Sequence, residues 1–359
     1  MSRIAILKTG ALGDVLRTTS ILPGLHGRYA GAHVTWVTAH AAVDLVARHP
    51  QVAEVVAVDP RDPDDVARAT RELAGEPWER VLSFDDEVDL CRMASTLAAG
   101  GLPGPISGAY LAAGGERRYT DDVAPWFDMG LLSVHGKEEA DRRKVENDAS
   151  HPAIFARMLG IEMGEPELPL PEDALTYARG FAERTELAAR RPVVGLNTGA
   201  GGRWESKRLS EEGTAALVGL LHRRLGGGAS FLLLGGPEEA ERNAAIAARV
   251  AGMRADAGPI HLVDAGTDNP MTRFGGLVDL LDLLVTSDSL AMHVAIARRV
   301  PVVAFFAPTS AAEIELYGRG ERVVSTAPDY CSYRPDADNS SITPERIADA
   351  VERVLGAPE

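Results

Sequence analysis

Residues 3–18 read RIAILKTGALGDVLRT, and this stretch decides the fold class. The apolar run Ile4–Leu7 has the length of a buried β-strand, two glycines follow it, and residues 14–29 carry the apolar spacing of an amphipathic helix. The same order returns at residues 192–208, PVVGLNTGAGGRWESKR. A strand that ends in a glycine-containing loop before a helix is typical of a βαβ unit in a parallel sheet. The chain therefore predicts an α/β fold with two doubly wound sheets.

Short apolar runs alternate with helical segments on both sides of these two stretches. We expect helices at 41–48, 63–74 and 87–99, short strands and turns over 100–120, and two or three helices in an insertion at 121–160. Further strands are predicted at Val34–Val37, Val55–Val58, Val81–Phe84, Ser230–Leu234, Ile260–Val263, Leu283–Thr286 and Val302–Phe306.

A proline-rich segment predicts the boundary between two domains. Residues 165–172 read EPELPLPE, and three prolines in eight residues suit an extended linker. We therefore expect an N-terminal Rossmann-like domain at 1–170 and a C-terminal one at 171–342. A last helix over 343–359 begins at Thr343–Pro344–Glu345 and is free in this scheme to pack back on the N-terminal domain.

Composition and charge exclude several classes of protein. The 359 residues are 45% hydrophobic and 25% charged, which is the composition of a globular protein. The net charge of −15 has the wrong sign for general nucleic-acid binding. Cys91 and Cys331 cannot form a disulfide framework, and no apolar run reaches the length of a membrane span. We expect a cytoplasmic protein, working there or in peripheral contact with the inner face of the membrane.

The loop after the first strand carries the strongest candidate for a catalytic base. Gly10 and Gly13 let a ligand approach the backbone closely, and Asp14 follows at the start of the next helix. The spacing is neither a dinucleotide fingerprint nor a Gly-Lys-Ser/Thr phosphate loop. Asp14 also suits a helix cap, and both roles are compatible.

Three strand-to-helix loops in the second half predict a site for a nucleotide diphosphate. The loop 197–208 combines small residues, including Thr198 and Gly199, with Lys207. Each loop also has an ordinary structural interpretation as a solvated turn or a helix start. The other two loops contribute Glu238, which could accept hydrogen bonds from ribose hydroxyls, and the group Asp288, Ser289 and His293 near a helix start.

These motifs together resemble glycosyltransferase family 9, which includes the ADP-heptose:lipopolysaccharide heptosyltransferases. The likeness rests on GALGDVL at 10–16, on NTGA at 197–200 through Lys207–Arg208, on Asp288–Ser289 through His293, and on 301–310. It runs from Arg3 to about Gly320. The resemblance implies a GT-B fold and an inverting, metal-independent transfer from a nucleotide sugar.

The resemblance also implies roles for single residues. Asp14 matches the family's proposed base, and Lys207 matches the lysine that neutralises the leaving diphosphate. The donor contacts implied are Thr198, Gly199, Glu238, Asp288, Ser289 and His293, and we expect acceptor contacts from Gly10, Gly13, Asp121 and Trp126.

The departures from the family pattern concern the phosphate loop and a cysteine cluster. Leu290–Ala291 stands where relatives usually have Gly-Pro, which puts the sugar and nucleotide preference in doubt. Some relatives carry several cysteines in the segment matching 327–341, whereas this chain has only Cys331, so we expect no metal there. Asp85–Asp86–Glu87 is interpreted as an acidic turn at a strand end.

The leading hypothesis is an inverting glycosyltransferase that moves a sugar, with heptose expected, from an ADP-sugar to a hydroxyl of a cell-envelope glycan or small glycoside. No cofactor is expected. The alternatives are a nucleotide-sugar epimerase or hydrolase on the same fold, and a catalytically silent nucleotide-sugar-binding scaffold. The sequence does not determine the sugar, the base, the acceptor, the linkage or the oligomeric state.

Overall fold

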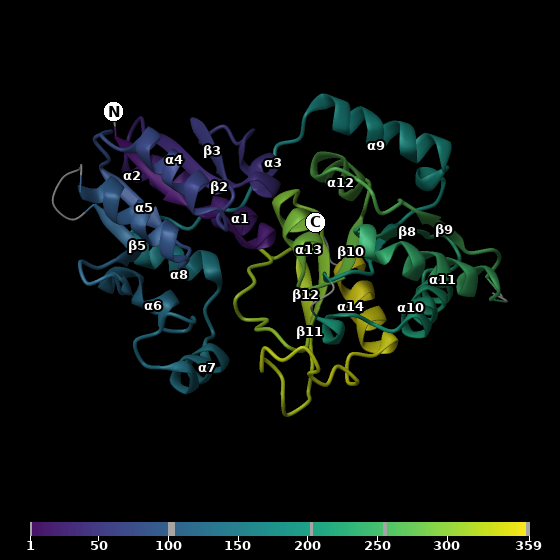
Figure 1. Cartoon of the computed structure of the whole chain (residues 1–359). Helices are drawn as coiled ribbons and strands as arrows, with labels where there is room; N and C mark the ends of the chain where they lie inside the picture. Colours follow the sequence, from purple (N-terminus) through teal and green to yellow (C-terminus); the bar gives the residue numbers. More distant parts are fainter. Residues whose placement is uncertain (1, 100–104, 202–203, 254–256, 357–359) are drawn as a thin grey trace. The chain divides into compact units, whose positions relative to one another are not determined.

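The computed structural model describes residues 2–99, 105–201, 204–253 and 257–356 (Figure 1). The chain forms two compact units, Met1–Pro169 and Leu170–Glu359. Their boundary falls inside the proline-rich segment 165–172. In the described parts of the chain, no helix combines the length and the apolar character that a membrane crossing requires.

The first unit is built on a six-stranded sheet with the order β3-β2-β1-β4-β5-β6. All neighbours run parallel except β5 and β6. Ile6 in the central strand lies opposite Trp36 on one side and Leu82 on the other. The strands are β1 Arg3–Leu7, β2 His33–Ala39, β3 Glu54–Val58, β4 Arg80–Ser83, β5 Ile106–Leu111 and β6 Arg117–Tyr119.

One face of this sheet is covered by two helices that share a core with it (Figure 1). The helix α4 (Pro63–Leu73) begins where the Asp62 side chain accepts hydrogen bonds from the backbone N–H groups of Asp64 and Asp65. Its apolar side and that of α5 (Val88–Ala99) bury Val66, Ala69, Leu73, Leu90, Met93, Ala94 and Leu97.

The remaining helices of the first unit include those of the expected insertion. The predicted helices over 121–160 are present as short segments, of which α8 ends at Gly160 in the left-handed region. The elements are α1 Leu12–Thr18, η1 Thr19–Ile21, α2 Leu22–Arg28, η2 His40–Ala42, α3 Val43–Val46, η3 Asp121–Val123, α6 Ala124–Phe127, α7 Lys137–Glu146 and α8 His151–Leu159.

The second unit repeats the plan with a fully parallel six-stranded sheet of order β12-β11-β10-β7-β8-β9. The strands are β7 Val193–Asn197, β8 Ser230–Leu234, β9 His261–Asp264, β10 Leu283–Ser287, β11 Val302–Phe306 and β12 Gly320–Val324. The helices are α9 Glu172–Arg184, η4 Leu187–Ala189, η5 Glu205–Lys207, α10 Glu211–Arg224, η6 Pro237–Glu239, α11 Ala240–Ala251, α12 Met271–Val278, α13 Leu290–Ala297 and α14 Pro344–Gly356.

In each sheet the direction of winding reverses at one place. The chain order runs outward from β1 to β3 and then outward on the other side from β4, and the second sheet reverses in the same way between β7 and β10. Ligands of doubly wound folds bind beyond the carboxyl ends of the strands at such a reversal. Residues at the ends of β1, β4, β7 and β10 are therefore the first to examine.

Two features differ from the sequence-based expectations. The edge strand β12, GERVV, was not expected, because its first half is polar and it follows a long loop. The second feature is the last helix, α14, for which the sequence left packing on the N-terminal domain open. Its apolar face is instead buried in the core of the second unit, where Ile347 and Val351 join Val303, Phe305 and Val323.

Candidate active site

At the reversal of the second sheet, one asparagine joins the loops after β7 and β10. Asn197 ends β7, and its side-chain amide donates to the backbone oxygen of Gly199 at 2.7 Å. The same nitrogen lies 3.2 Å from the hydroxyl oxygens of both Thr286 and Ser289. This residue was not singled out from the sequence, and it fixes the two loops that carry the candidate phosphate contacts.

Lys207 is directed at the loop after β10. Its ammonium donates hydrogen bonds to the backbone oxygen and to a carboxylate oxygen of Asp288, each at 2.9 Å. The lysine side chain is only 12% exposed, and its ammonium lies 5.5 Å from the centre of the Trp204 ring. A lysine ammonium has three N–H donors, so the two bonds to Asp288 leave a third for a ligand.

The short helix that presents Lys207 is held by a distant segment of the same unit. The backbone N–H of Ser206 donates to the oxygen of Pro335 at 3.2 Å. The side-chain amide of Asn339 donates to the backbone oxygens of Ser206 and Arg208 at 3.0 and 2.9 Å. These bonds order the loop that positions the lysine.

Asp288 is a buried carboxylate that stays ionised. Burial by itself would raise its pKa, but the charges of Lys207 and His293 outweigh that effect and hold the pKa at about 2. The His293 ring nitrogen lies 3.9 Å from the second carboxylate oxygen. Lys207, Asp288 and His293 thus lie together in one cluster, and their binding of a diphosphate stays a prediction.

A second buried polar group lies beneath Thr198 and Gly199. The Thr198 hydroxyl donates to the side-chain oxygen of the fully buried Asn243 at 2.5 Å. The carboxylate of Glu239 is 4% exposed and accepts the backbone N–H of Gly236 at 2.9 Å. A methyl group added to Gly199 would lie 2.3 Å from the Glu239 carboxyl carbon, so only glycine allows this approach.

The motif resemblance predicts Glu238 as the acid near the ribose. In the structure the next residue, Glu239, is the buried one. Glu238 is exposed on η6, while Glu239 points under the loop 197–199. The second carboxylate oxygen of Glu239 has no hydrogen-bond partner in the described residues. Two consecutive glutamates give no sequence signal for which one turns inward, so this assignment needed the tertiary structure.

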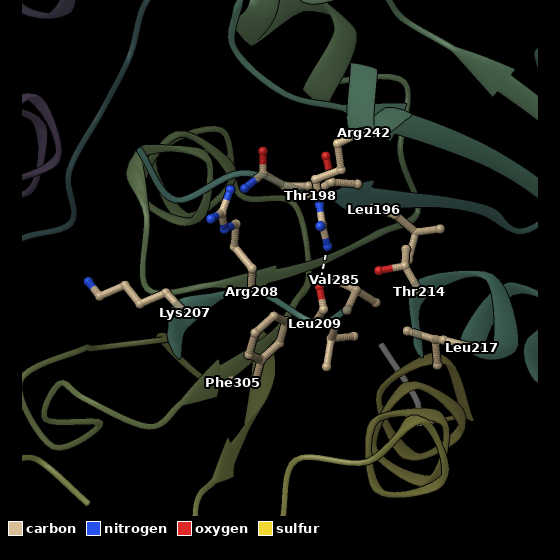
Figure 2. A pocket seen from close by; sticks show the side chains of 11 residues that line it. Leu196, Thr198, Lys207, Arg208, Leu209, Thr214, Leu217, Arg242, Val285 and Phe305 are labelled. Atoms are coloured by element: carbon tan, nitrogen blue, oxygen red, sulfur yellow. Dashed lines mark hydrogen bonds between the residues drawn. The ribbon is translucent and has the colours of Figure 1, made fainter. Parts of the chain in front are cut away.

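A small cavity opens beside this loop (Figure 2). The Arg242 side chain reaches from α11 into it and donates to the backbone oxygen of Leu209, while Lys207 is directed away from Arg242. Burial, together with the neighbouring charge of Arg208, lowers the pKa of Arg242. Val285, Phe305 and Leu217 form the apolar wall.

The reversal of the first sheet carries a buried ion pair. Lys8 follows β1 and Asp85 follows β4, and the lysine ammonium donates to the Asp85 carboxylate. The hydroxyl of Thr9 donates to the other Asp85 oxygen at 2.8 Å, as does the Thr9 backbone N–H. Burial would lower the pKa of Lys8, but Asp85 and Asp14 raise it above its ordinary value. Asp85 therefore anchors the glycine loop and is more than part of an acidic turn.

Asp14 lies in the first turn of α1 and is not its cap. The N-cap position is Ala11, which makes no side-chain cap bond. A carboxylate oxygen of Asp14 lies 2.9 Å from a guanidinium nitrogen of Arg17, one turn along the helix. Arg17 in turn lies over the ring of Trp126, at 5.3 Å from its centre.

Residues 132–341 match the family described as glycosyltransferase family 9 (heptosyltransferase), which is more than half of the chain. The chain belongs to glycosyltransferase family 9. It is therefore a glycosyltransferase of the heptosyltransferase type, as the sequence motifs predicted.

This family 9 glycosyltransferase is similar to known relatives over nearly its whole length. Lipopolysaccharide heptosyltransferase 1 of Pseudomonas aeruginosa is 25% identical, over 99% of both chains. The crystal structure of a family 9 glycosyltransferase from Veillonella parvula superposes with a TM-score of 0.75 at 20% identity, over 99% of this chain and 97% of that one. ADP-heptose lipopolysaccharide heptosyltransferase II of E. coli gives 0.64 at 20% identity, over 99% and 98%. These structural likenesses confirm the expected GT-B fold.

The family 9 enzyme brings most of its expected donor residues together in the second unit. Thr198, Gly199, Lys207, Asp288 and His293 belong to the connected groups described above. Ser289 takes the N-cap position of α13 without a side-chain cap bond, and its hydroxyl faces Thr286 and Asn197. Their contacts with a donor stay predictions.

The expected acceptor residues of the enzyme lie in the first unit and are less uniform. Gly10 has open space where a side chain would be, while Gly13 is buried within α1. Asp121 is exposed at the start of η3. Trp126 packs edge-on against His151 and Phe155, at 5.0 and 5.5 Å between ring centres. Acceptor binding by these four residues stays a prediction.

The segment that carries a cysteine cluster in some relatives is here a largely exposed loop with one buried cysteine. Cys331 is buried, and its backbone N–H donates to the oxygen of Ala307 at 2.9 Å. Within the described residues, no three side chains of His, Cys, Asp or Glu come together as a metal-binding group. That this enzyme needs no metal stays a prediction from its sequence.

Proposed function

We propose that this enzyme transfers a heptose from an ADP-activated donor to a hydroxyl of a cell-envelope glycan, with inversion at the anomeric carbon. The observation that carries the proposal is the pair of hydrogen bonds that the Lys207 ammonium donates to Asp288 where the second sheet reverses its winding. Asp288 aims the lysine ammonium, and the third N–H of the lysine is available to a diphosphate oxygen.

The donor half of the mechanism is stabilisation of a leaving group. As the bond between the anomeric carbon and the diphosphate oxygen breaks, negative charge collects on the departing ADP. Lys207 and the backbone N–H groups of Gly199 and Ala200 would oppose that charge, while the N–H of Thr198 donates to the oxygen of Leu234. This arrangement supplies by protein groups the charge stabilisation that many transferases take from a divalent cation, which supports a metal-independent reaction.

The acceptor half needs one general base. Asp14 would take the proton of the acceptor hydroxyl as its oxygen attacks the anomeric carbon from the face opposite the diphosphate. A single displacement of this kind inverts the configuration. The guanidinium of Arg17 lies 2.9 Å away, and a neighbouring cation favours the charged form of a carboxylate, which is the form that accepts a proton.

The carboxylate of Glu239 supports recognition of the ribose of ADP in the donor. One oxygen is held by Gly236, and the other is an acceptor without a partner in the described residues. A ribose diol donates hydrogen bonds and would satisfy this oxygen once the loop 197–199, which covers it in this structure, has moved aside. The name of the Pseudomonas relative supports lipopolysaccharide as the acceptor class, which the enzyme would reach at the inner face of the membrane.

Product analysis tests the function. The enzyme is incubated with ADP-heptose and EDTA, with and without lipopolysaccharide from a heptose-deficient strain. ADP release that depends on acceptor, with a glycoside product of inverted anomeric configuration, is the expected result. Donor consumption without acceptor would indicate the epimerase or hydrolase, and binding without consumption would indicate the silent scaffold.

A further inference from the structure

Arg17 is a shielded cation between the expected base and an aromatic wall. Its guanidinium lies 2.9 Å from Asp14 and 5.3 Å from the centre of the Trp126 ring. The arginine side chain is 12% exposed, compared with 37% for that of Asp14. The base therefore faces outward while its counter-ion is covered.

This pair differs from the surface ion pairs of the same unit. Arg48 and Asp44 make a comparable contact of 3.0 Å between neighbouring helical turns, but their side chains are 41% and 48% exposed. Exposed pairs of that kind are screened by water and have little effect on either partner. The covered guanidinium of Arg17 acts on Asp14 through a medium of lower effective permittivity.

The aromatic wall is itself fixed. Trp126 meets His151 and Phe155 edge-on, and the rings of His151 and Phe155 stack with their centres 3.9 Å apart. Phe155 continues to Phe84 at 4.8 Å. A planar guanidinium held over such a ring has few alternative rotamers.

We propose that Arg17 is a positioning residue for Asp14, which it holds ionised and in one orientation by bridging it to Trp126. This inference rests on the proposed role of Asp14 as the base. The GALGDVL motif ends one residue before Arg17, so the motif does not include this device. The arginine forms no bond to substrate in this role and acts only through the carboxylate.

Other charged and titratable groups lie near Asp14 and Arg17. Lys8 interacts with Asp14, but its ammonium is bonded to Asp85. The elements that pack on α1 include α3, α8, η1 and η2. They bring Asp44, which pairs with Arg48, His40, which lies 3.6 Å from Asp65, and His151 and Arg157 of α8.

The first experiment needs no substrate. Protein labelled with ¹³C at the aspartate carboxyl groups is titrated by NMR, and the Asp14 signal is assigned by its loss in Asp14→Asn. In Arg17→Leu we expect the titration midpoint of Asp14 to rise by about one pH unit. Arg17→Lys should restore most of this shift because it keeps the charge. Arg48→Leu is the matched control and should leave the midpoint unchanged.

The second experiment separates charge from orientation. Turnover of ADP-heptose is followed against pH, with heptose-deficient lipopolysaccharide and, in parallel, with water as acceptor. Arg17→Leu should move the acidic limb to higher pH and lower kcat about tenfold even on the plateau. Arg17→Lys should recover the limb but not kcat, since an ammonium lacks the planar face that lies on Trp126.

Several outcomes overturn the inference without touching the proposed function. An unchanged Asp14 midpoint in a folded Arg17→Leu protein would do so, as would a rise in acceptor KM with unchanged kcat and pH profile. Folding is checked by the melting temperature, and Arg17→Gln serves if the leucine variant is unstable. Full turnover by Asp14→Asn would instead remove the base, and with it the proposed mechanism.

Discussion

The ammonium of Lys207 lies 2.9 Å from both a carboxylate oxygen and the backbone oxygen of Asp288, although 81 residues separate the two in the chain. The contact joins the loop after β7 to the loop after β10, the two strands between which the second sheet reverses. The Lys207 ammonium therefore holds both the charge and the backbone of the loop after β10 in place.

Replacing the carboxylate of Asp288 should change the pH dependence of stability. The folded-state pKa of about 2 lies below the ordinary value of 3.8, so the ionised group stabilises the fold above pH 4. This stability is lost as the pH falls from 4 toward 2. In Asp288→Asn we expect a loss of about 2 kcal/mol at pH 7. Urea unfolding at pH 7 and pH 3 measures it, and parallel pH curves for both proteins would contradict it. Asp44→Asn, from an exposed pair, should change little.

Replacing the ammonium of Lys207 should weaken ADP binding. Lys207→Met keeps the length of the stem and removes one charge-assisted hydrogen bond to the diphosphate. We expect the Kd for ADP to rise about 10- to 100-fold, since hydrogen bonds to charged groups contribute roughly 1.5–3 kcal/mol. Titration calorimetry at two salt concentrations checks this result. Lys137→Met is the control, because that lysine side chain is 80% exposed and pairs with Asp141 on its own helix. Equal affinity of Lys207→Met and wild type would remove Lys207 from the donor site.

The two adjacent glutamates should respond differently to the same substitution. Glu239→Gln keeps an oxygen for the Gly236 N–H but turns the other atom from an acceptor into a donor. We expect wild type to prefer ADP over 2′- or 3′-deoxy-ADP by about tenfold, and Glu239→Gln to lose most of that preference. Glu238→Gln should keep it. If the exposed Glu238 variant loses the preference and the Glu239 variant does not, the original assignment from the sequence is the better one.

The close approach of Gly199 to Glu239 predicts that alanine is not tolerated there. The added methyl group would lie 2.3 Å from the Glu239 carboxyl carbon, so the buried side chain must move. We expect a loss of about 1–3 kcal/mol in unfolding free energy, together with weaker ADP binding. Gly27→Ala is the matched control. It lies in α2 with open space around the new methyl group, and it should be neutral or stabilising. Equal melting temperatures of the two variants would contradict the prediction.

Much of the architecture could be predicted from local sequence patterns. The strands β1, β7, β10 and β11 are short apolar runs bounded by glycine, proline or helical segments, and such runs identify buried parallel strands. The strand β12 escaped this test because Gly320–Glu321–Arg322 is polar. It lies at an edge of the sheet, where one side needs no apolar partner, and Glu321 pairs with Arg353 of α14.

The candidate site was predicted in part, because chemistry and position are encoded differently. Asp14, Lys207, Asp288 and His293 stand in strand-to-helix segments or in the first turns of the helices that follow, and the sequence shows that placement. Which side chains then face one another depends on the order of strands in the sheet, which joins Lys8 to Asp85 and Lys207 to Asp288 across about 80 residues each.

The sequence by itself therefore determined the fold class, through short-range periodicity, and the family, through its motifs, and it predicted which strand-to-helix loops to expect at the site. Only the tertiary structure decided that Glu239 and not Glu238 turns inward, that Asp85 anchors the loop of Asp14, and that Arg17 lies between the base and Trp126. The physical reason is that burial and long-range pairing arise when distant strands and helices pack together. No local pattern in the chain records which of two polar neighbours loses its water in that step.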